Sequence, residues 1–317
     1  MIDRIKKFDL TNKSIFIAGH NGMVGKATLN ELKLKSNKIY TIDKKKLDLR
    51  DEYSVAKWFE KNQPQVVINA AAMVGGIHAN NIFPVDFLEN NLRIQNNIIK
   101  CSYNSGVEKL LFLGSSCIYP KECLQPIKEE YLFTGKLEPT NEWYAIAKLA
   151  GIKLCEAYQK QYDCNYISLI PTNLYGVNDN FHPLYSHVPA ALIRRFHEAK
   201  VNNLKSVSVW GTGNPRREFM HVSDLAKAIT FMLEYYSSEK PINIGTGLDV
   251  SIHDFAKLIS QVVGYKGQIV FDHSKPDGMQ LKRLDISKAT SIGWHPQIDL
   301  NDGLKNTYEW ALKNIFI

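Results

Sequence analysis

A tyrosine and a lysine four residues apart, Tyr144 and Lys148, form a pair that is suited to proton transfer. They stand at the start of an apolar run with helical spacing that continues through Tyr158. Residues four apart on a helix share one face, with about 6 Å between their Cβ atoms, so the ammonium lies beside the phenol. A neighbouring cation favours the phenolate, and this lowers the phenol pKa from about 10 toward the working range of an acid or base. The spacing also fits an ordinary amphipathic helix, and other segments must support the catalytic interpretation.

A glycine-rich turn near the N-terminus provides that support. The apolar run Ser14–Ala18 leads directly into this turn, and a helical pattern then extends to Leu34. A strand, a glycine turn and a helix in this order bind dinucleotides, because glycines permit close backbone approach and the helix N-terminus faces the pyrophosphate. The spacing is G-x-x-G-x-x-G instead of the more typical G-x-G-x-x-G, but its flanking elements favour function. The turn reads Gly19-His20-Asn21-Gly22-Met23-Val24-Gly25.

The segment after the second apolar strand, Lys38–Ile42, bears on the choice of cofactor. It begins with Asp43 and Lys44, and two further lysines follow. An acidic residue here binds the free ribose 2′-hydroxyl of NAD, whereas a basic residue accommodates the 2′-phosphate of NADP. Both types are present, so this segment alone leaves the choice open, and the lysines also fit a solvated turn. Asp48 and Leu49 are predicted to lie near the adenine.

Two more apolar segments predict central strands of a parallel sheet. Gln65–Ala70 is continuously apolar, as expected for a strand that is buried on both faces. Lys109–Leu113 is the predicted fourth strand, and Ser115 and Cys117 follow it closely. Ligands of doubly wound sheets bind at the carboxyl ends of strands, so both side chains are candidates for chemistry. Their structural alternatives are a turn cap for the serine and a small buried hydrophobe for the cysteine. The predicted fold class is α/β, with a Rossmann-type doubly wound parallel sheet.

The composition excludes several classes of protein. The 317 residues suffice for one large domain or two joined ones, and the 39 basic and 32 acidic residues give a net charge of +7. These charges are spread along the chain without a long basic block, which argues against nucleic acid as a partner and suits an anionic small molecule. No apolar run approaches the roughly 20 residues that span a bilayer. The five cysteines lack metal-ligand spacing, so we expect reduced thiols, no metal and a cytoplasmic protein.

Together these segments resemble the extended short-chain dehydrogenase/reductases, whose active sites combine a serine at the fourth strand with Tyr-X-X-X-Lys on the following helix. Several longer strings are similar to the GDP-L-fucose synthase family within that group. The resemblance extends from about Ser14 to the C-terminus. The strings are Gly19–Gly25, Leu113–Pro120, Glu138–Glu142, Pro171–Gly176, Asp179–Pro183 and Arg217–Val222.

The resemblance implies epimerisation of GDP-4-keto-6-deoxy-D-mannose at C3 and C5, followed by NADPH reduction of the C4 ketone. The ketone acidifies the protons on both neighbouring carbons, so epimerisation needs a base, a proton donor on the opposite face and stabilisation of the enolate oxygen. By resemblance, Cys117 is the base and His187 the acid. Ser115 and Tyr144 hold the C4 oxygen. Tyr144 then protonates it, while Lys148 lowers the tyrosine pKa and holds the nicotinamide ribose.

The resemblance also implies two sets of binding residues. Arginine suits the substrate diphosphate because its fork geometry permits bidentate contact. The cofactor set is Gly19, His20, Asn21, Gly22, Met23, Val24, Gly25, Asp43, Lys44, Asp48, Leu49, Ala71, Leu113, Gly114, Tyr144, Lys148, Pro171, Asn173, Leu174 and His187. The substrate set is Ser116, Asn173, Arg195, Trp210, Arg217 and Asp277.

The same resemblance implies a chain in two parts that forms a homodimer. Residues 1–171 and 210–240 are expected to bind NADP(H), and residues 172–209 and 241–317 are expected to bind the GDP-linked 4-keto sugar. The helices near 86–104 and 142–162 are expected to form the dimer interface.

The chain departs from the family pattern at three places, and these keep other substrates open. Trp143 replaces a common proline, Leu184-Tyr185 replace smaller polar residues, and Leu281 stands where a basic residue is usual. A C4 reductase of a related GDP-4-keto sugar, such as a heptose, is therefore an alternative. A sugar-nucleotide 4,6-dehydratase would carry an acidic residue near Cys117. A non-enzymatic NADP sensor would have lost part of the Ser-Tyr-Lys set, which is complete here.

Overall fold

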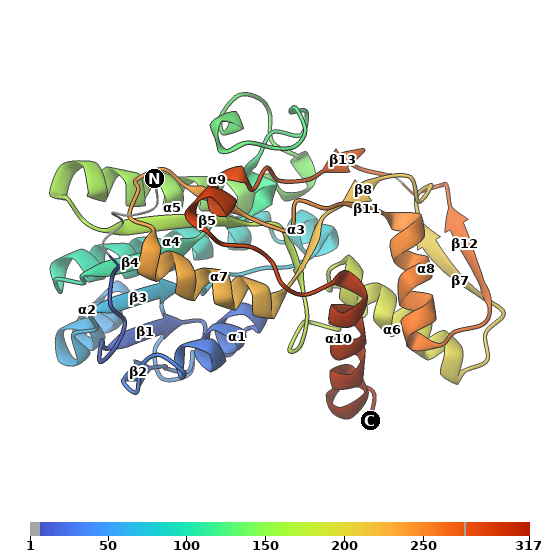
Figure 1. Ribbon diagram of the computed structural model, residues 1–317, viewed down its shortest axis with the longest axis horizontal. Coiled ribbons are helices and arrows are strands. Elements are labelled where there is room, and N and C mark those ends of the chain that lie inside the picture. Colours follow the sequence, from blue (N-terminus) through green and yellow to red (C-terminus); the bar gives the residue numbers. More distant parts are fainter. Residues whose placement is uncertain (1–6, 276) are drawn as a thin grey trace.

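The computed structural model describes residues 7–275 and 277–317, which form two lobes (Figure 1). The larger lobe is built on a six-stranded sheet with the order β10-β5-β4-β3-β1-β2. All of its pairings are parallel. The strands are β1 (Ile15–Ala18), β2 (Ile39–Tyr40), β3 (Val66–Asn69), β4 (Lys109–Leu113), β5 (Tyr166–Pro171) and β10 (Ile242–Ile244).

Helices cover both faces of this sheet, which explains why its central strands are largely apolar and fully buried. Phe16 and Val67 pack in the core on one face, and Ile15 and Ile17 pack in the core on the other. Because side chains alternate along a strand, both sets must be apolar to bury both faces. The predicted doubly wound α/β fold is confirmed. One face carries α2 (Glu52–Asn62), α4 (Pro84–Asn104) and α5 (Glu142–Tyr162); the other carries α1 (Met23–Leu32), α7 (Val222–Tyr235) and α9 (Ser287–Ile292).

The strand order reverses between β1 and β3, which are neighbours in the sheet. The glycine turn follows β1, and the segment containing Ala71 follows β3. Ligands of doubly wound folds bind at such a switch point, outside the carboxyl ends of the strands. The fold therefore places the predicted dinucleotide turn at the expected edge of the sheet.

The smaller lobe has its own core and three small sheets. Phe196, Phe255 and Tyr308 are buried between its helices α6 (Val188–Val201), α8 (Ile252–Val263) and α10 (Leu300–Asn314). The sheets are β12-β7, β11-β8-β13 and β6-β9. Their strands are β6 (Asn173–Tyr175), β7 (Ser206–Trp210), β8 (Arg216–Arg217), β9 (Phe219–His221), β11 (Val250–Ser251), β12 (Gln268–Asp272) and β13 (Leu281–Lys282).

The lobes differ from the predicted domain boundaries at several places, and strand pairing shows this in both directions. The segment 242–244 was assigned to the sugar-nucleotide part, but as β10 it extends the large sheet through the pair Ile242 and Leu169. Conversely, β8 was assigned to the cofactor part but joins the small sheet β11-β8-β13. In both cases a strand pairs with strands of the other lobe and not with those nearest to it in the sequence. The chain therefore passes between the lobes several times. None of the helices in the described residues is both long and apolar enough to cross a membrane.

Candidate active site

Helix α5 brings Tyr144 and Lys148 to the carboxyl end of β4. The helix begins at Glu142, so both residues lie in its first two turns. Gly151 permits close packing on the sheet, since a Cβ there would meet Phe112 Cζ at 2.3 Å. Lys148 Nζ donates a hydrogen bond to the Leu113 carbonyl at 2.8 Å and lies 5.8 Å from the centre of the Tyr144 ring. The structure thus brings the predicted pair together at the strand end.

The predicted effect of Lys148 on the tyrosine pKa is wrong for the chain by itself. Burial raises the pKa of Tyr144, and the nearby Cys117 thiol raises it further. Burial also lowers the pKa of Lys148 to about 8. Desolvation penalises the charged form of each group, and it is the largest cause of both shifts. Tyr144 therefore carries its proton at neutral pH, as a proton donor must.

Ser115 and Cys117 follow β4 in a short 3₁₀ turn, Ser116–Ile118. Ser115 Oγ accepts a hydrogen bond from the Cys117 backbone N–H at 3.4 Å, so the serine also caps this turn. Ser116 is buried, and Cys117 is half-buried. Burial raises the pKa of the Cys117 thiol, while the Lys282 and Lys148 ammonium groups act in the opposite direction. The cationic neighbours favour the thiolate that a base requires.

Lys282 also faces His187, the predicted acid. His187 is the N-cap residue of α6 and is exposed. The pKa of His187 is lowered by desolvation and then by the Lys282 charge. One ammonium therefore acts on both predicted epimerisation residues. Lys282 was not predicted from the sequence, because β13 has only two residues and offers no periodic signal.

The glycine turn fits the pyrophosphate of a dinucleotide. Gly19 has φ +85°, and a Cβ there would meet Ala71 N at 2.7 Å. A Cβ at Gly25 would meet the Gly19 carbonyl oxygen at 2.1 Å, so α1 needs glycine to approach the turn. The N-cap of α1 is Gly22, which offers no side-chain cap, and the first turn holds no acidic residue. Backbone N–H groups at such a terminus suit an anion.

The residues predicted to meet the adenosine have different partners. Asp43 accepts a hydrogen bond from Asn21 Nδ2 at 2.7 Å and lies 3.6 Å from His20 Nε2. Lys44 is exposed, and among residues 7–275 and 277–317 we find no ion-pair partner for it. The acidic residue is thus engaged by the glycine turn while the lysine is available to an anion, an arrangement that suits a 2′-phosphate.

Other members of the predicted cofactor set lie near the carboxyl ends of strands. Asp48 forms an ion pair with Arg50 at 2.6 Å, which lowers the pKa of its carboxyl to about 2, and Leu49 is half-buried. Asn173 Nδ2 donates to the Glu218 carbonyl at 2.8 Å. The rest lie at or just after the ends of β1, β4 and β5: Met23, Val24, Leu113, Gly114, Pro171 and Leu174.

An exposed tryptophan between two cations marks the far end of the site. Trp210 is 60% exposed, and Arg195 and Lys275 each lie 5.6 Å from its ring centre. Asp277 accepts hydrogen bonds from the Thr212 backbone N–H at 2.7 Å and from its hydroxyl at 2.8 Å. The Asp277 carboxylate therefore fixes the turn after Trp210, which the sequence did not indicate.

Two cations from different segments stand side by side between Trp210 and the β4 end. Arg217 and Lys282 are register partners in the parallel pair of β8 and β13. Burial lowers the pKa of both groups, and the charge of Arg217 lowers that of Lys282 further. Adjacent half-buried cations suit an anion with several charges.

A doubly wound sheet with a glycine turn at its switch point, and Ser-Tyr-Lys at the end of the fourth strand, defines an extended short-chain dehydrogenase/reductase. The chain belongs to the NAD dependent epimerase/dehydratase family, whose model matches residues 15–245. It is 54% identical over 302 residues to GDP-L-fucose synthase 1 of Arabidopsis thaliana, which covers 95% of this chain and 94% of the relative.

Solved structures extend this similarity. A GDP-L-fucose synthetase from Naegleria fowleri bound to NADP has a TM-score of 0.91 at 31% identity, covering 98% of each chain. A GDP-6-OMe-4-keto-L-xylo-heptose reductase from C. jejuni has a TM-score of 0.90 at 37% identity, covering 97% of this chain and 99% of that one. The resemblance to GDP-L-fucose synthases that the sequence motifs indicate is therefore confirmed.

Proposed function

We propose that the chain converts GDP-4-keto-6-deoxy-D-mannose by epimerisation at C3 and C5 and by NADPH-dependent reduction at C4. The observation that carries the proposal is geometric: Ser115 and Cys117 follow β4 directly, and α5 brings Tyr144 and Lys148 to the same strand end, where Lys148 Nζ is held by the Leu113 carbonyl. The charge of Lys282 acts on both Cys117 and His187. An acid/base pair for carbon and a proton donor for oxygen thus share one site. Relatives named GDP-L-fucose synthase, at 54% identity, support the substrate.

NADP(H) fits the residues at the switch point. Gly19, Gly22 and Gly25 allow the pyrophosphate to approach backbone N–H groups, and Lys44 meets the 2′-phosphate. Lys148 holds the nicotinamide ribose. The bound nicotinamide supplies a hydride to C4. The NADP-bound relative from Naegleria fowleri supports the same cofactor.

In the epimerisation, Cys117 as thiolate removes the proton from C3 or C5, and the electron pair moves to the C4 oxygen as an enolate. Ser115 and Tyr144 donate hydrogen bonds to that oxygen. His187, as the imidazolium, returns a proton to carbon on the opposite face. Cys117 then releases its acquired proton to solvent, and His187 takes one up from solvent. Lys282 favours the thiolate of Cys117 and lowers the pKa of His187, which makes the His187 imidazolium a stronger proton donor.

In the reduction, Tyr144 gives its proton to the C4 oxygen as the hydride adds. The raised pKa of Tyr144 keeps that proton in place until the oxygen becomes basic. The Lys148 ammonium, held by the Leu113 carbonyl, then stabilises the phenolate that remains. One ketone site therefore serves both reactions.

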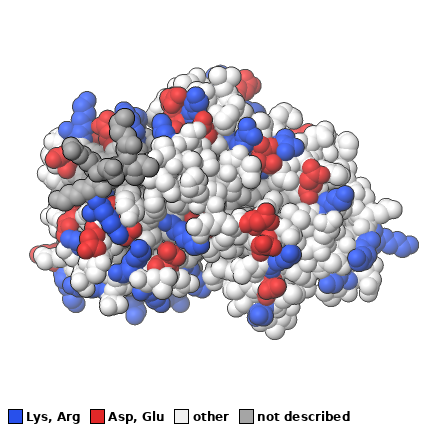
Figure 2. Space-filling view, in the orientation of Figure 1, with Lys and Arg blue, Asp and Glu red and all other residues white. Residues whose placement is uncertain are grey.

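The substrate diphosphate binds Arg217 and Lys282, and the guanine lies near Trp210 and Arg195. Over the face drawn in Figure 2, acidic and basic side chains are interspersed. A related GDP-4-keto-heptose is the second candidate substrate. It is favoured by the structural similarity to the C. jejuni heptose reductase, while the Cys117 and His187 pair favours an epimerase.

A homodimer through α4 and α5 is part of the proposal. These helices pack against each other on one face of the sheet. Large apolar residues on them remain exposed and support an interface with a second copy: Val85, Tyr103, Trp143, Ile146 and Tyr162. We also propose a cytoplasmic location, where free cysteines persist and nucleotide sugars are made.

The test is NADPH oxidation with GDP-4-keto-6-deoxy-D-mannose in deuterated water, followed by mass and NMR analysis of the sugar. We expect turnover with deuterium at C3 and C5 and an L-configured product. Turnover without deuterium would leave a C4 reductase. Turnover of the corresponding GDP-4-keto-heptose alone would establish the second substrate, and no turnover of either would contradict the proposal.

A further inference from the structure

A buried carboxylate, that of Glu218, follows the proposed diphosphate ligand Arg217 directly in the sequence. Glu218 is 0% exposed and lies between β8 and β9. Burial of a charged carboxylate costs several kcal/mol unless hydrogen bonds or a counterion compensate for it. Burial raises the pKa of Glu218, and backbone hydrogen bonds act against that shift. The backbone hydrogen bonds around Glu218 therefore stabilise its charged form.

The Glu218 carboxylate is compensated by backbone N–H groups from two distant segments. Oε1 accepts hydrogen bonds from Thr246 N at 2.5 Å and from Gly247 N at 2.9 Å. Oε2 accepts one from Leu284 N at 2.8 Å. Gly245 makes this approach possible, since a Cβ there would meet Oε1 at 2.2 Å. The carboxylate thereby joins the loop after β10 to the chain that leaves β13.

The backbone of Glu218 contacts two more elements of the site. Its N–H donates to the Lys282 carbonyl at 3.2 Å. Its carbonyl accepts hydrogen bonds from Asn173 Nδ2 at 2.8 Å and from Thr172 Oγ1 at 3.4 Å. One residue therefore fixes β13, β6 and the loop at 246–247 relative to Arg217.

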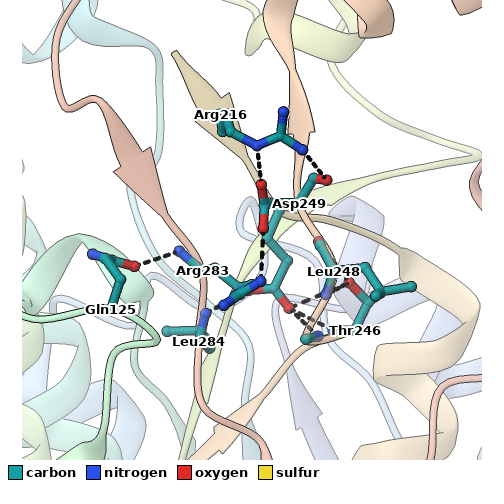
Figure 3. A network of polar contacts seen from close by, with 9 residues as sticks. Gln125, Arg216, Thr246, Leu248, Asp249, Arg283 and Leu284 are labelled. Carbon is teal, nitrogen blue, oxygen red and sulfur yellow. Dashed lines mark hydrogen bonds and ion pairs between the residues drawn. The ribbon is translucent and has the colours of Figure 1, made fainter.

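A second carboxylate, Asp249, binds the two arginines that adjoin the site cations in the sequence (Figure 3). Asp249 forms ion pairs with Arg216 and, at 3.0 Å, with Arg283. Arg216 and Arg283 precede and follow the two site cations, and side chains alternate along a strand. The two carboxylates thus have separate tasks. Asp249 binds the arginines that point away from Arg217 and Lys282, whereas Glu218 sets the backbone that carries them.

We propose that Glu218 is a positioning residue for the substrate diphosphate. Its carboxylate fixes β13 beside β8 and so holds Arg217 and Lys282 at the separation that two linked phosphates require. The proposal rests on the proposed function, in which these cations bind the diphosphate. Fixed placement matters because a cation pair that must reorganise on binding gives up part of its interaction energy.

The test compares the binding of GDP, GMP and NADPH to Glu218→Gln and the unchanged protein by calorimetry and cofactor fluorescence. The amide retains the shape of the carboxylate but presents an N–H₂ group to one of the backbone donors. We expect GDP affinity to fall about tenfold, the difference that a charged hydrogen bond supplies, with GMP and NADPH affinities unchanged. A general loss of structure would weaken all three ligands together.

Two further variants sharpen the result. Gly245→Ala pushes its methyl group toward Oε1 without changing charge, so it should also reduce the preference for GDP over GMP, even if Glu218→Gln does not fold. Asp249→Asn weakens the ion pairs of Arg216 and Arg283, which are not the proposed diphosphate ligands, and should leave that preference intact. The inference is overturned if Gly245→Ala and Glu218→Gln keep the preference, or if Asp249→Asn loses it equally. If the unchanged protein itself does not prefer GDP, the proposed diphosphate contact fails instead.

Discussion

The reacting end of the site and its diphosphate end are built in different ways. Ser115, Cys117, Tyr144 and Lys148 come from one strand end and the following long helix, α5. Arg217 and Lys282 come from two-residue strands that are far apart in the sequence. The first group is positioned by regular packing on a large sheet, and the second by buried carboxylates that hold short segments together. Chemistry and binding are therefore expected to respond separately to substitution.

Tyr144→Phe should give the largest effect, and it tests the reacting end. Removal of the phenolic proton should slow NADPH oxidation by about 10²–10⁴-fold, the usual contribution of a general acid. GDP affinity should be unchanged, because GDP lacks the 4-keto sugar to which the Tyr144 phenol is proposed to donate. Steady-state kinetics and GDP calorimetry measure the two effects. Equal losses in both would contradict the separation of the two ends.

Cys117→Ser should separate the two reactions within the reacting end. Serine is a much weaker base than a thiolate, so deuterium incorporation at C3 and C5 should fall about 10²-fold or more. Reduction of an already epimerised 4-keto sugar should persist, because Tyr144 and Lys148 remain. Cys164→Ser is the matched control, since this half-buried thiol follows α5 and lies outside the site. Loss of reduction in Cys117→Ser would show that the two roles are not separable.

Lys282→Gln should affect both ends, because Lys282 adjoins Arg217 and Cys117. Burial raises the pKa of the Cys117 thiol, and the Lys282 charge lowers it. Removal of the ammonium should therefore raise that pKa further. Alkylation of Cys117 by iodoacetamide requires the thiolate and should rise with pH in both proteins, with the variant profile displaced to higher pH. GDP affinity should fall about tenfold. An unchanged alkylation profile would remove Lys282 from the reacting end.

Trp210→Ala should give the smallest effect and should be confined to binding. Stacking of a base on an aromatic ring contributes about 1 kcal/mol or more, so the KM for the GDP-sugar should rise about fivefold. Thermal stability should change little because the side chain is largely exposed. A change in kcat with unchanged KM would place Trp210 in a different role.

The contrast between the two ends also explains what the sequence could predict. The glycine turn, the strand at Lys109–Leu113 and the Tyr144 and Lys148 pair depend on local periodicity, and the structure contains each of them. The raised pKa of Tyr144 depends on burial by the folded chain, which spacing does not reveal. Lys282 becomes adjacent to Arg217 only when β8 and β13 pair across some sixty residues, and strands of two residues have no periodic signal.

The order of the segments along the chain has a consequence for synthesis on the ribosome. The residues of the cofactor turn and the reacting end are all made before residue 190, whereas β10 and β13 follow at 242–244 and 281–282. N-terminal units generally fold first as a chain emerges. The Glu218 carboxylate can complete its hydrogen bonds only after Leu284 has been synthesised. A nascent chain therefore acquires its cofactor turn well before it can hold a diphosphate. Substrate capture is thus postponed until the protein is nearly complete.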